Sequence, residues 1–386
     1  MARADIVLAA RPRFLDNACL HHWRSAPPTR WPGSRTTLTK NKKRALIVVG
    51  MLISVGFLWF ALRGTDFAQI SHALANSSPW MVLPMLAAYA IYYWIKAVRW
   101  RLMLLPVKDA TTRSLVRPMM IGFFGNNVLP AHLGEFVRMY LGARQLGLRN
   151  SEVLATIVLE RMFDFLAVVF FLGVALVLSR DVPEGLVTIG YVTGIVGIVF
   201  MIFASLYVAM TPAFLAAVRR LTFFLPAKVR NAGLHQLELG ATGLQSLRRL
   251  PLLLGVIATS IAQWGFMGLT IWVSLRAVGL EGRIAPAFVV LAATTFGVTL
   301  PSAPGFLGTV QAGYVLALEP FGVSRAEAFA ASAFFHLPTF AAVTLLGLWL
   351  LRGEGNRVGD IQREAESAAA TESEQTDHEQ KARSAE

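Results

Sequence analysis

Apolar residues in this chain are grouped into blocks, and each block is about as long as one membrane crossing. Residues 45–62, 186–209 and 252–275 contain no Asp, Glu, Lys or Arg. A helix needs about 20 apolar residues to cross the hydrocarbon core of a bilayer. With three further blocks that carry few charges, the pattern predicts spanning helices at residues 45–62, 80–100, 153–178, 186–209, 252–275 and 330–351. The expected fold class is therefore an all-α polytopic membrane protein.

Two polar segments flank this transmembrane domain, which we place at residues 45–351. Residues 1–44 are basic and contain several turn-forming residues, and we expect a partly disordered cytoplasmic segment. Residues 352–386 are polar and rich in Glu, Ser, Ala and Gln. They lack the apolar area that would offset the entropy of ordering, so we expect a disordered cytoplasmic tail.

Two other apolar regions, 118–141 and 286–318, are interrupted by Pro, Gly and polar residues. Proline removes a backbone donor and breaks a helix. Broken backbone at membrane depth is tolerated only where protein or a water-filled cavity covers it. We therefore expect two re-entrant broken hairpins with a site between them. The candidate site residues in these regions are Asn126, Asn127, Pro130, Gly134, Pro301, Ser302, Pro304, Gly305, Gly308 and Gln311.

The two broken regions also resemble each other. The pattern P-x-x-L-G occurs at residues 130–134 and again at residues 304–308. At nearly the same offset, a repeat unit at 80–178 falls on a second unit at 252–351, with one predicted helix between them. A single intervening crossing makes the second unit enter from the opposite side, so we predict an inverted repeat, unless the short motif matches by chance. Inverted repeats with broken segments are typical of transporters.

The placement of the basic residues predicts the orientation of the chain. The chain is 55% hydrophobic and 15% charged, with a net charge of +13. With the N-terminus inside, 30 Lys and Arg residues fall on the cytoplasmic side, six of them from Lys96 to Arg117, and five fall outside. Lys and Arg are enriched in cytoplasmic loops, so we expect both termini in the cytoplasm of a cell membrane. This topology accounts for the positive charge without a nucleic acid partner.

Three charged residues, Glu160, Arg161 and Asp164, fall inside the predicted span 153–178. A charge at the centre of a bilayer costs about 2.5–3.5 kcal/mol on insertion scales, so these side chains need partners. Glu135 and Arg138 follow the first break, and we predict that all five residues form one buried cluster. The cluster is either a structural set of salt bridges or a site where Arg138 and Arg161 meet a lipid phosphate. Paired carboxylates also leave acid–base catalysis open.

The second repeat unit carries weaker polar signals. His336 stands where the first unit has Arg161, and it is either a group that titrates near neutral pH or a hydrogen-bonded structural residue. Tryptophans near the ends of predicted spans are expected to be interfacial anchors. They are Trp59, Trp80, Trp94, Trp100 and Trp349. Cys19 is the single cysteine, which excludes an internal disulfide and a multi-cysteine metal site.

The run N-V-L-P-A-H-L-G-E-F-V-R at residues 127–138, followed by Glu160, Arg161 and Asp164, resembles the lysylphosphatidylglycerol synthase transmembrane region, a family of flippase-like proteins. The run P-S-A-P-G-F-L-G-T-V-Q at residues 301–311 is similar to that family's later P-G-G-x-G-x-x-E segment. Gln311 replaces the family's Glu, and His336 stands where an Arg is common. The resemblance implies a stand-alone flippase-like protein without a synthase domain.

Three hypotheses about function follow from these features. The leading hypothesis is a lipid translocator that moves or presents a polar or anionic lipid between leaflets. The alternatives are a non-transporting accessory protein of a lipid or cell-envelope pathway, and an intramembrane transferase that acts on a lipid-linked group. For the leading hypothesis we expect no enzymatic activity, no cofactor and no bound metal. The expected partners are membrane lipids with an anionic or polar head group, and a lipid-modifying enzyme is a second candidate.

Overall fold

The computed structural model describes residues 40–129, 132–178, 249–280, 284–299 and 303–352, with a few positions between 188 and 222. Every element in these ranges is a helix. Met1–Arg35 is a unit of its own and lies outside the described residues. Pro130, Pro301, Ser302, almost all of the predicted span 186–209 and the predicted tail, apart from Arg352, also lie outside them.

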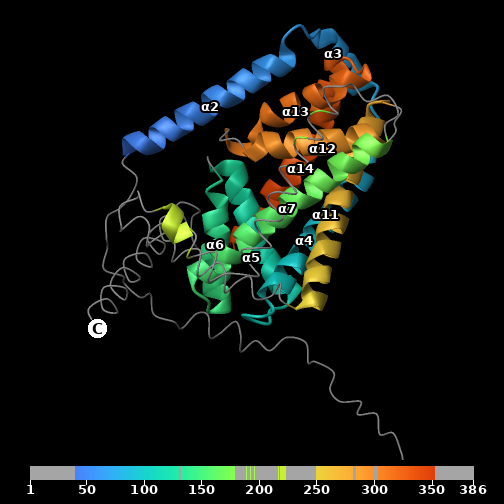
Figure 1. The fold of residues 1–386 in the computed structure, drawn as a ribbon. Helices are drawn as coiled ribbons and strands as arrows, with labels where there is room; N and C mark the ends of the chain where they lie inside the picture. The colour runs from blue at the N-terminus through green and yellow to red at the C-terminus, as the bar shows by residue number, and fades with distance from the viewer. Residues whose placement is uncertain are drawn as a thin grey trace, which may run out of the picture. The chain divides into compact units, whose positions relative to one another are not determined.

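The helices follow one another as a series of long spans and shorter pieces (Figure 1). They are α2 (Lys40–Leu62), α3 (Phe67–Ala75), η1 (Pro79–Met81), α4 (Val82–Leu104), α5 (Thr112–Val128), α6 (Gly134–Leu146), α7 (Asn150–Leu178), α11 (Leu250–Ala277), α12 (Ile284–Thr299), η3 (Pro304–Phe306), α13 (Thr309–Leu318), η4 (Glu319–Phe321) and α14 (Arg325–Arg352).

Four of these segments are long and apolar enough to cross a membrane. They are Pro79–Leu104, Asn150–Leu178, Leu250–Ala277 and Arg325–Arg352. The predicted spans at 80–100, 153–178, 252–275 and 330–351 are thus confirmed as membrane-length helices. Gly50–Leu62 and Phe67–Ala75 pass the same test only as a pair bent by 83°. The predicted span at 45–62 lies within the single helix α2, and α2 and α3 together form one bent candidate crossing.

The helices α4 and α11 lie side by side and run antiparallel (Figure 1). At one end, the backbone N–H of Ser78 donates to the Ala277 carbonyl at 2.8 Å. At the other end, a Cβ added to Gly255 would lie 3.2 Å from Leu102 Cδ1. The first end also holds the start of α14, because α14 packs against α3, which leads into α4, and Arg325 donates to the Phe60 carbonyl of the preceding helix at 3.1 Å. We call it the Arg325 end.

The opposite end holds the start of α5 and the end of α14. Arg117 Nη2 donates to the Leu350 carbonyl at 3.3 Å, and Gln145 Nε2 donates to the Ser114 carbonyl at 2.9 Å. The second bond ties the last turn of α6 back to the first turn of α5. We call this the Arg117 end, and it is where the pair formed by α5 and α6 begins and returns.

The two broken regions are both helical hairpins. In the first, α5 and α6 pack closely, and a Cβ on Gly125 would lie 2.9 Å from the Gly134 Cα. In the second, α12 and α13 pack together, and a Cβ on Gly313 would lie 2.8 Å from Thr294 Cγ2. The second hairpin follows α11 and precedes α14, so its base lies at the Arg325 end. The two hairpins therefore enter the bundle from opposite ends.

The tips of the two hairpins meet. His132 and Phe306 occupy the same position of the P-x-x-L-G pattern, and their ring centroids lie 5.3 Å apart. Among the described residues they are also the non-glycine residues with positive φ, at 56° and 58°. A non-glycine residue with positive φ is uncommon. The repeated motif therefore produces the same unusual backbone twice, and the two copies touch.

A glycine is required where each break turns back into a helix. A Cβ at Gly134 would meet the Gly122 carbonyl oxygen and the Asn126 amide nitrogen of the facing helix. Gly308 has φ of 89°, and a Cβ there would meet the Ser54 carbonyl oxygen of α2. The side-chain oxygen of Ser54 also accepts from the Ala303 amide at 2.7 Å. These contacts seat α2 directly against the second break.

Candidate functional site

The candidate site is a network of charged side chains centred on α7. Glu160 and Asp164 are one turn apart on this helix and are almost fully buried. Glu160 Oε2 accepts from Arg138 Nη2 at 2.7 Å, and its Oε1 lies 2.7 Å from Lys96 Nζ. Asp164 Oδ1 accepts from Arg99 Nη2 at 2.6 Å. Each carboxylate is thus paired with more than one cation or donor, as burial of an ion requires.

Two of these cations, Lys96 and Arg99, were counted from the sequence among the basic residues of the cytoplasmic side, and that count is wrong for both. Both lie within α4, with side chains only 1% and 0% exposed. Without them, the predicted number of Lys and Arg residues on the cytoplasmic side falls by two, and the bias remains. The signal that could have found them is their position inside the predicted span 80–100, where a charge needs an internal partner.

The helix α11 supplies uncharged hydrogen-bond partners to Asp164 and Arg99. Trp264 Nε1 donates to Asp164 Oδ1 at 2.8 Å, and Gln263 Nε2 donates to the same oxygen at 3.3 Å. Ser260 Oγ accepts from Arg99 Nη1 at 3.0 Å. These three residues were not singled out in the sequence, because each is a common residue of a buried helix face.

Arg138 is held in place by an aromatic ring as well as by Glu160. Its guanidinium carbon lies 4.0 Å from the centroid of the Trp100 ring, a cation–π arrangement. Trp100 Nε1 in turn donates to Thr156 Oγ1 at 3.0 Å. Trp100 is fully buried, so its predicted role as an interfacial anchor is wrong. Trp59, Trp80, Trp94 and Trp349 are exposed, as that role requires.

The network is closed on most sides and open at Arg161. The Arg161 side chain is 49% exposed, whereas its neighbour Glu135 is 21% exposed. Arg161 Nη2 lies 3.0 Å from Glu135 Oε1 and 3.5 Å from Glu160 Oε1, and Arg161 Nη1 lies 3.5 Å from Asp164 Oδ2. The five charged residues predicted to cluster are therefore joined in one network, but Arg161 is only half-buried.

We call these residues the ion cluster: Lys96, Arg99, Glu135, Arg138, Glu160, Arg161 and Asp164. It contains four cations and three carboxylates. Two guanidinium Nε atoms, those of Arg99 and Arg138, and one Glu135 oxygen are buried without a hydrogen-bond partner. The cluster thus carries an excess positive charge, and its accessible group is a cation.

The described candidate residues of the second hairpin and of α14 form a set apart from the ion cluster. Gln311 Nε2 lies 3.1 Å from His336 Nδ1, and Gln311 Oε1 accepts from the Gly308 amide at 2.7 Å. Gly305 has φ of 74° and packs against Phe340, and Pro304 starts the η3 turn. The pair of Gln311 and His336 joins α13 to α14, as Glu135 and Arg161 join α6 to α7. The second hairpin therefore repeats this connection with an amide and an imidazole in place of a carboxylate and a guanidinium.

Asn126 and Asn127 lie on α5 and do not join the ion cluster. Asn127 Nδ2 donates to Thr344 Oγ1 of α14 at 3.0 Å. Asn126 is buried against the start of α6, and its side-chain oxygen has no hydrogen-bond partner. Among the residues that the structure describes, no three His, Cys, Asp or Glu side chains are placed to hold a metal ion.

A bundle of apolar, membrane-length helices that encloses a network of ion pairs defines an integral membrane protein with a polar interior. The chain belongs to the lysylphosphatidylglycerol synthase TM region family, which it matches over residues 47–347. This confirms the resemblance seen in the two motifs.

Curated relatives share this membrane domain at low identity. A UPF0104 membrane protein of Methanothermobacter thermautotrophicus is 26% identical over 325 residues, covering 78% of this chain and 90% of that protein. A UPF0104 membrane protein of Methanocaldococcus jannaschii is 27% identical over 58% of this chain and 91% of its own length. Glycosyltransferase AglD of Haloferax volcanii is 26% identical over 136 residues, 35% of this chain and 22% of AglD. No solved structure matches the chain.

Proposed function

We propose that this protein translocates an anionic lipid between the two leaflets of its membrane. The observation that carries the proposal is the ion cluster, whose buried carboxylates are already paired and whose one half-exposed cation is Arg161. A salt-bridge cluster that only stabilised the fold would gain nothing from an excess cation at its open side. A head group with a negative charge would pair with it.

The chemistry of the open side favours a phosphate. An arginine guanidinium offers several N–H donors in a fixed plane, and it binds phosphate oxygens with two parallel hydrogen bonds. Arg161 uses only some of its N–H donors on Glu135, Glu160 and Asp164, at distances of 3.0 to 3.5 Å. A phosphate that approached Arg161 would compete with the loosely held carboxylates and would leave the tighter pairs with Lys96 and Arg138 intact.

The arrangement of the two hairpins supports movement between leaflets. We propose that they are re-entrant halves of an inverted repeat, with the predicted span 186–209 between them. Their entry from opposite ends and the contact between His132 and Phe306 support this. Glu135 lies one turn after His132, since its backbone amide donates to the His132 carbonyl at 3.0 Å. The open side of the ion cluster is therefore next to the point where the hairpins meet, which is where transporter folds place their substrate.

We further propose that the Arg117 end faces the cytoplasm. Arg101, Lys108 and Arg113 lie on the segments that meet at this end, together with Arg117. Arg63, Arg276 and Arg325 lie at the opposite end, which carries fewer basic residues in the described ranges. Short loops rich in Lys and Arg remain on the cytoplasmic side.

A second candidate is supported by the similarity of a 136-residue segment to 22% of a protein named glycosyltransferase AglD. The shared segment of 136 residues would then present a lipid to an enzyme partner instead of moving it. The two candidates share the head-group site and differ only in whether the lipid crosses the membrane. Transport measured on the purified protein separates them.

The test is a leaflet-exchange assay in vesicles that contain the full-length protein. Fluorescent phosphatidylglycerol and phosphatidylcholine are incorporated, and a membrane-impermeant reductant reports how much label reaches the outer leaflet. The wild-type protein should accelerate exchange of phosphatidylglycerol, and Arg161→Gln should abolish most of that acceleration. Arg101→Gln is the matched control, because Arg101 pairs with exposed Asp109 outside the ion cluster.

Three outcomes decide between the candidates. Acceleration that depends on Arg161 and not on Arg101 supports translocation of an anionic lipid. Lipid that co-purifies with the wild-type protein and not with Arg161→Gln, with no exchange, supports the presenting role. No exchange and no bound anionic lipid would reject both.

A further inference from the structure

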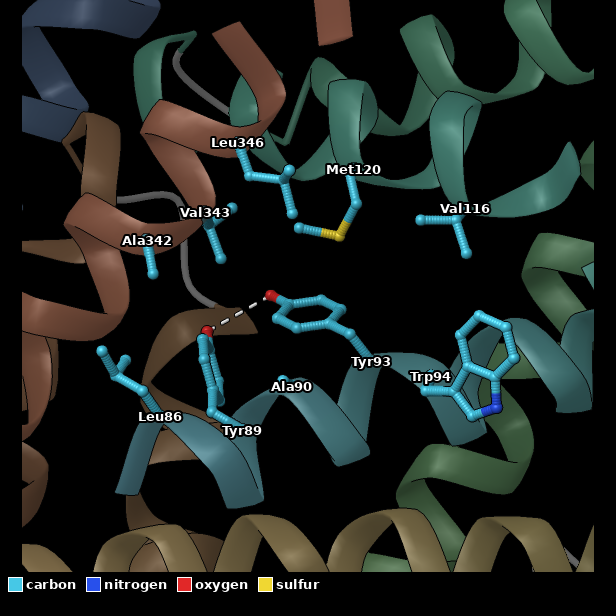
Figure 2. Close-up of a pocket in the computed structure, with 10 residues that line it drawn as sticks. All are labelled: Leu86, Tyr89, Ala90, Tyr93, Trp94, Val116, Met120, Ala342, Val343 and Leu346. Atoms are coloured by element: carbon cyan, nitrogen blue, oxygen red, sulfur yellow. Dashed lines mark hydrogen bonds between the residues drawn. The ribbon is translucent and has the colours of Figure 1, made fainter. Parts of the chain in front are cut away.

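An apolar groove lies on the outside of the bundle, between α4, α5 and α14 (Figure 2). It has a volume of about 190 Å³. Tyr89 and Tyr93 of α4 form its floor, Met120 of α5 and Val343 of α14 face them, and Ala90 lies between the two rings. The rim residues Ala90, Trp94 and Leu346 are exposed, so the groove is open sideways.

The polar atoms that distinguish this groove are two tyrosine hydroxyls. The hydroxyls of Tyr89 and Tyr93 lie 3.2 Å apart and form a hydrogen bond in which either one can be the donor. A hydroxyl carries one hydrogen, and the pair consumes only one of its two hydrogens. The other hydrogen is left for another acceptor, and the remaining lining of the groove is apolar apart from the indole N–H of Trp94. A polar hydrogen in apolar surroundings is costly unless it meets an acceptor.

The surroundings of the groove define its occupant. The outer surface of membrane-length helices faces lipid tails, which are as apolar as leucine. A hydrocarbon chain can therefore enter the groove from the bilayer without first losing bound water. An acceptor on the same lipid can take a hydrogen bond from the hydroxyl of Tyr89 or Tyr93. The carbonyl of an acyl ester is such an acceptor. We propose that the groove between α4, α5 and α14 binds the acyl chain of an ester-linked lipid, with its ester carbonyl at the hydroxyls of Tyr89 and Tyr93.

The groove leads toward the ion cluster. Tyr89, Tyr93, Lys96 and Trp100 follow one face of α4, because residues three and four apart are neighbours on a helix. The ring of Phe123 lies 5.2 Å from the Tyr93 ring and 5.6 Å from Lys96 Nζ. Phe123 therefore lies next to both the groove and the ion cluster. This rests on the proposed function: one lipid places its chain in the groove and its head group on the ion cluster.

Photolabelling tests the position of the chain directly. Full-length protein in vesicles is illuminated with phosphatidylglycerol that carries a diazirine in one acyl chain, and the labelled peptides are mapped. Label is expected on the facing parts of α4, α5 and α14. Ala90→Trp fills the groove and should remove most of this label, whereas Ala87→Trp, at an exposed site of α4 outside the groove, should keep it. Equal label in the two variants would overturn the proposal.

Competition tests the ester carbonyl. In detergent, unlabelled diacyl phosphatidylglycerol should displace the probe roughly two- to tenfold better than the dialkyl ether with the same head group, the range of one hydrogen bond. In the double variant Tyr89→Phe, Tyr93→Phe the difference should vanish while the label stays in the groove. Equal competition in the wild-type protein would overturn the assignment of the carbonyl.

The two proposals fail in distinguishable ways. If Arg161-dependent exchange is observed and the groove takes no label, the groove proposal alone is rejected. If the groove is labelled and Arg161→Gln has normal exchange, the head-group site is rejected and the groove remains a lipid site.

Discussion

Glu160 is the residue whose neutralisation should damage this protein most. Its oxygens lie 2.7 Å from Arg138 Nη2 and 2.7 Å from Lys96 Nζ, and its side chain is 0% exposed. Glu160→Gln keeps the shape of the side chain and removes one negative charge. Two carboxylates would then face four cations, and both Lys96 and Arg138 would remain buried because the backbone of α4 and α6 holds them there.

The magnitude follows from the cost of an unpaired buried charge. Removing one partner of a buried pair costs about 3–5 kcal/mol. At roughly 2 °C per kcal/mol for a large domain, the midpoint of thermal unfolding should fall by roughly 6–10 °C. Glu135→Gln is the matched control, because among the described residues the ion-pair partner of Glu135 is the half-exposed Arg161. An exposed pair is worth about 0–1 kcal/mol, so that variant should lie within roughly 2 °C of the wild-type protein.

The assay is thermal unfolding of the purified protein in detergent, followed by the loss of its monodisperse peak in size-exclusion chromatography. Adding Lys96→Met to Glu160→Gln removes a cation together with the anion and should restore part of the loss. Equal destabilisation by Glu160→Gln and Glu135→Gln would refute the reasoning, since burial would then not determine the cost. Simple additivity in the double variant would show that Lys96 and Glu160 do not interact.

Two further predictions concern the hairpins and the orientation. Gly308→Ala should abolish most of the folded yield, because its Cβ meets backbone of α2 at a positive φ, whereas Gly173→Ala, which has open space, should fold normally with equal or higher stability. The monodisperse yield measures both, and a normal yield for Gly308→Ala would contradict the close contact. In a Cys19→Ser background, a membrane-impermeant maleimide added outside cells should label a cysteine at Asp66 and not one at Asp109, which lie at opposite ends of the bundle. Label at Asp109 alone would reverse the orientation, and label at both would contradict the opposite ends.

Much of the fold could be predicted from the sequence, because the hydrocarbon core of a membrane constrains each spanning segment by itself. A helix that crosses a bilayer needs about 20 apolar residues and satisfies its own backbone, so spans such as 153–178 can be found without knowing their neighbours. The same rule made the two P-x-x-L-G breaks conspicuous. It also predicted that Glu160, Arg161 and Asp164 need partners, and it led to Glu135 and Arg138 in the adjacent segment. The family membership followed from the same residues.

The partners across the bundle were decided by tertiary structure. Lys96 and Arg99 lie near the end of the predicted span 80–100. The sequence there does not show whether a cation reaches out of the membrane or points into the bundle. Only the packing of α4 against α7 and α11 shows that these cations point inward to Glu160 and Asp164. Hydropathy measures how apolar a segment is and not which neighbour each face meets. For that reason the burial of Trp100, the contact between His132 and Phe306, and the groove beside Tyr93 could not be predicted from the sequence alone.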